Sequence, residues 1–237
     1  MNRSGHVATA MLCGSLALHF MPGVPMKDAV ALLVGASIGG LLPDLDHKTS
    51  TLSNKVQFSA SVRKRFKATS GLFGLLGVIM YLGNLESHLW ALLAALACAA
   101  AANTRMLILS GSGALLVSWY ILQPVHWIVL LLGFALLIMP FVKHRGIIHS
   151  PEFALALSAG GLTLVLPDPT HLLVVGLLAG WWAHLAGDAL TAEGISSALF
   201  PRLKVALHLI HNGGAAEKCI AAASWLLSVC LWANMYL

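Results

Sequence analysis

An apolar run in the first fifth of the chain ends in two carboxylates and an imidazole, which are Asp44, Asp46 and His47. Carboxylate and imidazole groups are ligands that hard or borderline divalent cations accept. At the end of a membrane helix such groups are costly unless they are paired, ligated or hydrated. The stretch therefore predicts one part of a metal site, which other segments must complete.

Two later motifs carry the same kinds of group. His144 and His149 enclose a short segment between two apolar runs, and His184 and Asp188 are four residues apart. That spacing places the pair on one face of a helix, where both can ligate one ion or adjacent ions. Each motif alone has a simpler interpretation: a hydrogen-bonded pair, an Asx-capped turn, or a basic loop at a membrane surface.

The composition indicates a polytopic membrane protein with an all-α fold. Of 237 residues, 58% are apolar and 10% are charged, whereas soluble domains carry roughly 25% charged residues. The apolar runs are continuous rather than alternating, which disfavours a β-barrel. We expect one membrane-embedded domain over residues 1–237, built as a transmembrane helical bundle, and no nucleic-acid partner.

About eight to nine apolar helices are expected. Several of the runs are shorter than the ~20 residues of a full span, so some helices are expected to be tilted or only partly inserted. A basic cytoplasmic loop is expected at 48–70, either solvated or folded as an interfacial helix on anionic headgroups. The runs are 6–20, 28–43, 71–84, 87–103, 106–122, 124–142, 152–166, 171–190 and 216–237.

If each run crosses once, thirteen of the fourteen Lys and Arg residues fall on the side of the N-terminus, and only Lys27 falls on the other. The positive-inside rule makes the side with thirteen cytoplasmic. On this map most of the metal-type motifs lie at run ends on the cytoplasmic face. His6 opens the first run and Glu217 begins the last on the same face. The predicted metal ligands are His6, Asp44, His47, His144, His149, His184 and Asp188.

A shell of His and Asp without cysteine fits a divalent ion, with zinc first and manganese, iron or magnesium as alternatives. This many ligands makes two ions plausible, which could clamp a phosphoryl displacement or activate water. Asp46 and Glu217 are candidates for the proton acceptor, with Glu193 as a further ligand or base. Arg145 either meets an anionic substrate or serves only as a topology signal, and Ser150 and Thr191 are expected to cap helices.

At these residues the sequence resembles the YdjM-like family of LexA-regulated, inner-membrane-bound proteins classed as metal-dependent hydrolases. The matching pieces are His6, GGLLPDLDH at 39–47, HRGIIHS at 144–150, HLAGDALTAEGI at 184–195, and Gly213-Gly214 with Glu217. The resemblance implies a multi-helix protein of the bacterial inner membrane with a metal-dependent hydrolase activity. The HxxxD spacing is also similar to that of the all-helical zinc-dependent phospholipase C and nuclease group.

Together these features favour a hydrolase that cleaves a phosphoester in a lipid or lipid-linked substrate, using metal-activated water at the cytoplasmic face. A site at headgroup level meets amphiphiles first, although a soluble phosphoester remains an alternative. Two other functions fit the same residues: a transporter of metal cations, and a non-catalytic scaffold whose metal holds helices together. The sequence sets no oligomeric state.

Overall fold

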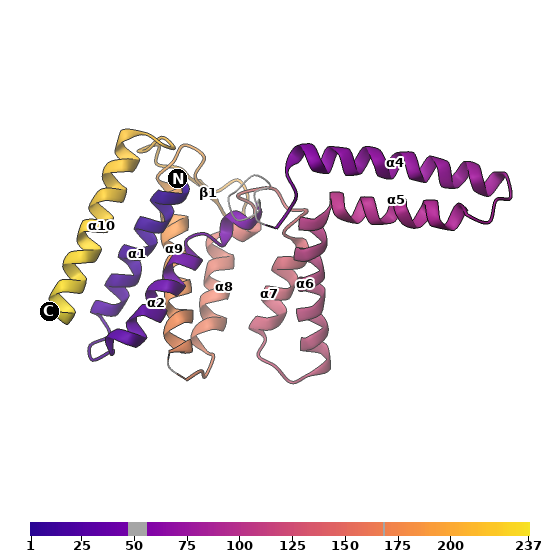
Figure 1. The fold of residues 1–237 in the computed structure, drawn as a ribbon. Helices are drawn as coiled ribbons and strands as arrows, with labels where there is room; N and C mark the ends of the chain where they lie inside the picture. The colour runs from indigo at the N-terminus through magenta and orange to yellow at the C-terminus, as the bar shows by residue number, and fades with distance from the viewer. Residues whose placement is uncertain (47–55, 168) are drawn as a thin grey trace.

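The computed structural model describes residues 1–46, 56–167 and 169–237, and it is all-α apart from one short hairpin (Figure 1). In the described residues the α-helices are α1 (Arg3–His19), α2 (Met26–Gly39), α4 (Ala60–Leu82), α5 (His88–Ala102), α6 (Thr104–Leu122), α7 (Ile128–Ile138), α8 (Pro151–Leu162), α9 (Thr170–Ala189) and α10 (Ala215–Tyr236). Two 3-10 turns, η1 (Pro43–Asp46) and η2 (Ile147–His149), follow α2 and precede α8. Strands β1 (Ile195–Ser196) and β2 (Lys204–Val205) pair antiparallel between α9 and α10.

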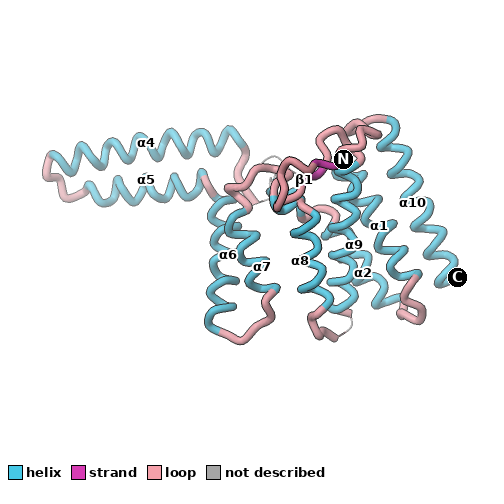
Figure 2. Tube along the Cα trace, turned by 180° about the vertical axis from the view of Figure 1, so that it is seen from behind, coloured by secondary structure: helices cyan, strands magenta, loops and turns pink. Residues whose placement is uncertain are grey.

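Helices α1, α2, α8, α9 and α10 stand side by side, with α6 and α7 as a neighbouring pair (Figures 1 and 2). The N-terminus, η1, β1 and the start of α10 gather at one end of this arrangement, which we call the site end. The turns between α1 and α2 and between α8 and α9 lie at the opposite end. The main apolar core packs α6, α7, α8 and α9 together, and a smaller one lies among α1, α2 and α9.

Helices α2 and α9 approach each other at backbone contact. Gly35 and Gly39 on α2, and Gly176 and Gly180 on α9, are spaced four apart and face the partner helix. A Cβ added at any of the four would lie 1.9–2.1 Å from a carbonyl oxygen of the other helix. Small residues at this spacing let membrane helices pack closely. The close packing brings the end of α2 against the last turns of α9, where the polar residues lie.

Helices α4 and α5 form a hairpin that projects sideways from the bundle (Figures 1 and 2). Residues 71–84 and 87–103, which we expected as two of the crossing segments, therefore run across the bundle axis and not along it. Residues 60–70 of the expected basic loop are helical and form the first turns of α4, while 48–55 lie outside the described residues. Apolar composition alone did not distinguish a helix that runs along the bundle axis from one that runs across it.

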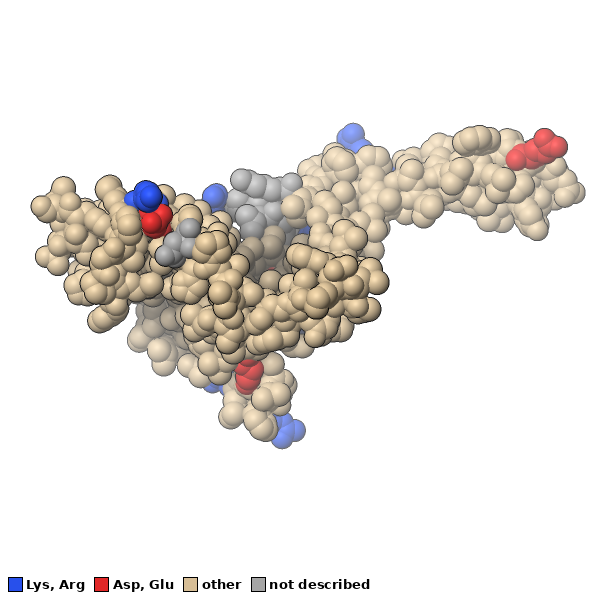
Figure 3. All heavy atoms as spheres, turned by 90° about the horizontal axis from the view of Figure 1, so that it is seen from below, with Lys and Arg blue, Asp and Glu red and all other residues tan. Residues whose placement is uncertain are grey.

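Four helical segments of the described chain are long and apolar enough to span a membrane: Met26–Asp46, Thr104–Leu122, Thr170–Ala189 and Ala215–Tyr236. Helices α5 and α7 are apolar but shorter. The end opposite the site end presents a surface with only a few isolated charged side chains (Figure 3).

Candidate metal centre

Four separate segments bring metal-type ligands to the site end. His6 comes from the first turn of α1, Asp44 from η1, His149 from η2, and His184 with Asp188 from the end of α9. Three overlapping groups of these side chains, one of them including His144, have ligand atoms within 4.8 Å of one another. The convergence that the sequence predicted is thus present in the structure.

His184 is oriented by the backbone of α2. Its Nδ1 lies 2.8 Å from the carbonyl oxygen of Gly40, which follows directly after α2. A carbonyl can only accept a hydrogen bond, so Nδ1 carries the proton and Nε2 presents its lone pair. Fixing the tautomer through the other ring nitrogen is how proteins prepare a histidine for a metal.

His149 faces the carboxylate of Asp46 as an ion pair. Its Nδ1 lies 3.1 Å from Asp46 Oδ2, and Ser150 and Pro151 hold the adjoining backbone by starting α8. The predicted cap is confirmed, because Ser150 Oγ accepts from the Phe153 N–H. Burial lowers the pKa of His149, but the carboxylates of Asp44 and Asp46 outweigh it and raise the pKa to about 9. Without a metal the His149 ring therefore carries a second proton at neutral pH, and metal binding releases that proton.

The two carboxylate oxygens of Asp188 have different contacts. Oδ1 accepts from Arg145 Nη2 at 2.9 Å and lies 3.2 Å from the Met1 nitrogen. Oδ2 faces the imidazoles, 3.4 Å from His184 Nε2 and 3.9 Å from His149 Nε2. Arg145 therefore holds the outer oxygen so that the inner one points at the rings.

The donor set fits one divalent cation. The buried atoms of the described residues that make no hydrogen bond include one ligand atom from each member of a single group: His149 Nε2, His184 Nε2 and Asp188 Oδ2. Asp44 Oδ1 completes the set at 3.9 Å from His149 Nε2 and 3.8 Å from His184 Nε2. Ligands at 2.0–2.1 Å from a tetrahedral zinc are about 3.3–3.4 Å apart. The observed separations between ligand atoms, 3.4–3.9 Å, are equal to this spacing or slightly longer. Buried polar atoms without partners are costly, and a cation would satisfy all three.

His6 extends the centre on one side. Its ring stacks on His184 with centroids 3.8 Å apart, and its Nε2 lies 3.4 Å from Asp188 Oδ1. It also groups with Asp44 and His184 as a possible second set of ligands. Because this set shares His184 with the first, and His184 has one free lone pair, His6 offers an alternative ligand to the same centre.

The centre is closed on most sides and open at one edge. The side chains of His149, His184 and Asp188 are at most 1% exposed, whereas those of Asp44 and His144 are 28% and 29% exposed. His144 Nδ1 donates to Asp46 Oδ1 over 2.7 Å, so Asp46 orients two imidazoles at once. Structural zinc sites are closed, whereas catalytic ones keep a position that water and substrate can reach.

Arg105 is a supporting residue whose role sequence reasoning missed. It is buried at the start of α6, and its Nη2 donates to the carbonyl oxygens of Leu45 and Asp46 at 2.6 and 2.9 Å. It therefore clamps the η1 turn that carries both aspartates. Its position as a lone cation at the start of an apolar helix was visible, but it was counted only as a topology signal.

Three predicted chemical groups are engaged elsewhere. Glu217 is buried and accepts from the N–H groups of Asn2 and Gly213 at 2.7 and 2.6 Å, which ties α10 to the start of α1. Glu193 is exposed and pairs with Arg145. Arg145 itself also donates to Thr191, so its guanidinium is committed to the end of α9. His47 lies outside the described residues.

We expect Asp46→Asn to weaken metal binding without unfolding the protein. The amide keeps the side-chain shape but can accept from only one of the two imidazoles, which lets His149 turn. Loss of such an orienting carboxylate typically costs about 10–100-fold in metal affinity. Competition with a chromogenic chelator measures it, and Asp28→Asn, at the opposite end in the first turn of α2, is the control. Equal affinities in the two variants would contradict an orienting role for Asp46.

Comparison with known proteins assigns the chain to a family. The family model described as YdjM inner membrane protein matches residues 1–237, so the protein belongs to this family. This confirms the resemblance carried by the polar motifs and places the chain among inner membrane proteins. No curated protein and no solved structure matches it.

Proposed function

From this family membership and the geometry of the centre, we propose that the protein is a membrane-bound metal-dependent hydrolase of phosphoesters. The observation that carries the proposal is the set of three buried, unpaired ligand atoms beside an edge that is partly exposed. A metal held only to join helices needs no such edge. The substrate we propose is a phosphoester in a lipid or a lipid-linked molecule.

The charge distribution supports a cytoplasmic position for the site end. Because α4 and α5 form a hairpin, removing both from the list of crossings leaves every other segment on the same side as before. The excess of thirteen basic residues to one therefore persists, and these residues belong on the cytoplasmic side. The centre then lies at the level of the inner-leaflet headgroups, where lipid phosphates are found.

A bound divalent ion supplies Lewis acidity to the phosphoryl oxygens. The chain supplies the proton transfers, and we assign these to His144 at the open edge. Its Nε2 takes a proton from the attacking water as the water oxygen bonds to phosphorus, and it returns a proton to the leaving oxygen as the ester P–O bond breaks. Asp46 is a positioning residue here, because it holds Nδ1 of His144 in place.

Purified protein tests the proposal directly. Protein prepared without added metal should contain a divalent ion by elemental analysis. It should hydrolyse a chromogenic phosphomonoester or phosphodiester, or phosphatidic acid in mixed micelles, and a chelator should stop the reaction. Metal-dependent cation uptake into proteoliposomes without hydrolysis would point to a transporter. Bound metal with neither activity, and a large loss of stability on chelation, would point to a scaffold.

We expect His144→Ala to lower kcat by about 10²-fold or more while the metal content stays unchanged, as removal of a general base does. The partly exposed His88, at the start of α5 on the α4–α5 hairpin, gives the matched control His88→Ala, which should keep full activity. Steady-state kinetics and elemental analysis on the same preparations measure both quantities. If bound metal falls together with kcat, His144 is a ligand and not the base.

A further inference from the structure

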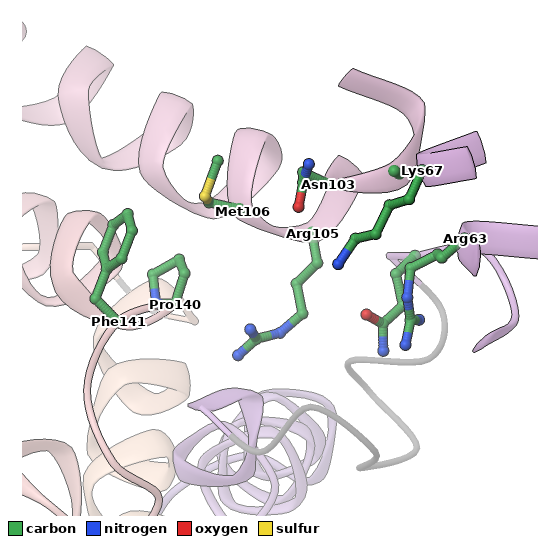
Figure 4. A pocket seen from close by; sticks show the side chains of 9 residues that line it. Arg63, Lys67, Asn103, Arg105, Met106, Pro140 and Phe141 are labelled. Atoms are coloured by element: carbon green, nitrogen blue, oxygen red, sulfur yellow. The ribbon is translucent and has the colours of Figure 1, made fainter. Parts of the chain in front are cut away.

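A basic pocket of about 240 Å³ lies beside the metal centre, between the start of α4, the start of α6 and the end of α7. Arg63, Lys67 and Arg105 are among its lining residues, and none of the nine residues that line it is acidic. The side chains of Lys67 and Arg105 extend into the same space, and Arg63 lies close by (Figure 4). Like charges gathered in one pocket repel one another, and a bound anion would relieve that repulsion.

Both arginines are held in place by backbone carbonyl groups. Arg63 Nη1 donates to the Phe58 carbonyl oxygen at 2.6 Å, and Arg105 donates to two carbonyl oxygens of η1. Carbonyl groups orient a guanidinium but carry no net charge, whereas the Asp46 carboxylate, which lies outside the pocket lining, attracts the Arg105 cation.

The opposite wall of the pocket is apolar. Met106, Pro140 and Phe141 line it, and Phe141 is largely exposed (Figure 4). A pocket with cations on one wall and apolar groups on the other matches a phosphate that is attached to a hydrophobic body. The cationic wall recognises the phosphate of a lipid headgroup and a free phosphate by the same charge-assisted hydrogen bonds.

We propose that this pocket binds the phosphate group of an anionic amphiphile and holds it next to the metal centre. Arg105 joins the two sites, because it lines the pocket and also donates to the Asp46 carbonyl oxygen. Naming the ligand as the substrate rests on the proposed hydrolase function. The binding of phosphate itself does not, since the three cations are separate from the metal ligands.

Binding measurements on protein in phosphatidylcholine nanodiscs test the pocket. The probes are short-chain phosphatidic acid, short-chain phosphatidylcholine and inorganic phosphate. Lys67→Glu should weaken phosphatidic acid binding about tenfold or more, as expected for a lost charge-assisted contact. Lys64→Glu makes the same charge change on α4 outside the pocket lining, and it should change the affinity less than twofold.

The probes separate the two sources of phosphate. Tighter binding of phosphatidic acid than of inorganic phosphate supports a lipid ligand, and equal binding supports recognition of phosphate alone. Equal effects of Lys67→Glu and Lys64→Glu overturn the pocket, as does phosphatidylcholine binding as tightly as phosphatidic acid. If neither variant folds, Lys67→Met and Lys64→Met remove the charges without adding an acid, and the same comparison decides.

The failure of the pocket and the failure of the hydrolase function give different results. Binding measured in the His184→Ala background does not depend on a complete metal centre. Phosphate binding that persists there supports the pocket, and absence of ester hydrolysis by the unsubstituted protein with its metal bound refutes the hydrolase. Hydrolysis with the same KM in Lys67→Glu and in the unsubstituted protein refutes the pocket and leaves the hydrolase intact.

Discussion

Replacing His184 with Ala, or Asp188 with Asn, is expected to remove the bound metal almost completely. Each change deletes a ligand atom that is fully buried and makes no hydrogen bond within the described part of the chain. The loss should exceed the roughly 10–100-fold weakening that follows from changing an orienting residue. Hydrolysis should fall to background in both variants, because the remaining ligands do not complete the shell.

Elemental analysis of purified protein measures this result as metal per chain. His88→Ala is the matched control, because it removes a partly exposed imidazole at the start of α5, on the hairpin that projects away from the centre. Circular dichroism and gel filtration in detergent should show unchanged helicity and a single species. A variant that remains folded and keeps the metal content of the unsubstituted protein would exclude its residue as a ligand.

The position of the site could be predicted from the sequence because polar residues mark where apolar runs end. His6, Asp44, His149 and Asp188 each lie at such an end, and counting ends placed them on one face of the bundle. The structure brings these residues together from four separate segments. The prediction that these residues converge thus needed only the number and order of the apolar runs. It does not depend on the exact limits of the helices.

The roles within the cluster could not be predicted, because spacing does not say which atom faces which. Asp46 was assigned as a base, yet both its oxygens are directed at imidazoles. Glu217 was assigned a chemical role, yet it accepts from two backbone amides at the start of α1 and α10. A carboxylate near a site can ligate, orient or brace the backbone, and only the directions of its neighbours distinguish these roles.

The glycines of α2 and α9 carried a signal that the search for chemical motifs passed over. Gly35 with Gly39, and Gly176 with Gly180, have the spacing of closely packed membrane helices. They explain how Asp44 and His184 come to share a site, since these residues follow the point of closest approach. The centre is therefore held by a backbone contact as much as by its own ligands.

We therefore expect Gly180→Ala to disturb the metal centre without touching a ligand. The new Cβ would lie 2.0 Å from the Ala36 carbonyl oxygen and 2.7 Å from the Gly40 nitrogen, so α2 must move away from α9. That movement takes the Gly40 carbonyl away from His184 Nδ1, which loses the partner that fixes its tautomer. Strain of this kind typically costs about 1–3 kcal/mol, and metal affinity should fall as well.

Gly111→Ala is the matched control, because Gly111 lies within α6 and a Cβ there meets nothing within 4 Å. Helix propensity alone favours Ala over Gly by about 1 kcal/mol, so this variant should be neutral or slightly more stable. Thermal unfolding in detergent and a chelator competition, run on both variants, measure stability and metal affinity together. Identical results for the two alanines would mean that α2 and α9 can separate without consequence, and that the ligands alone hold the centre.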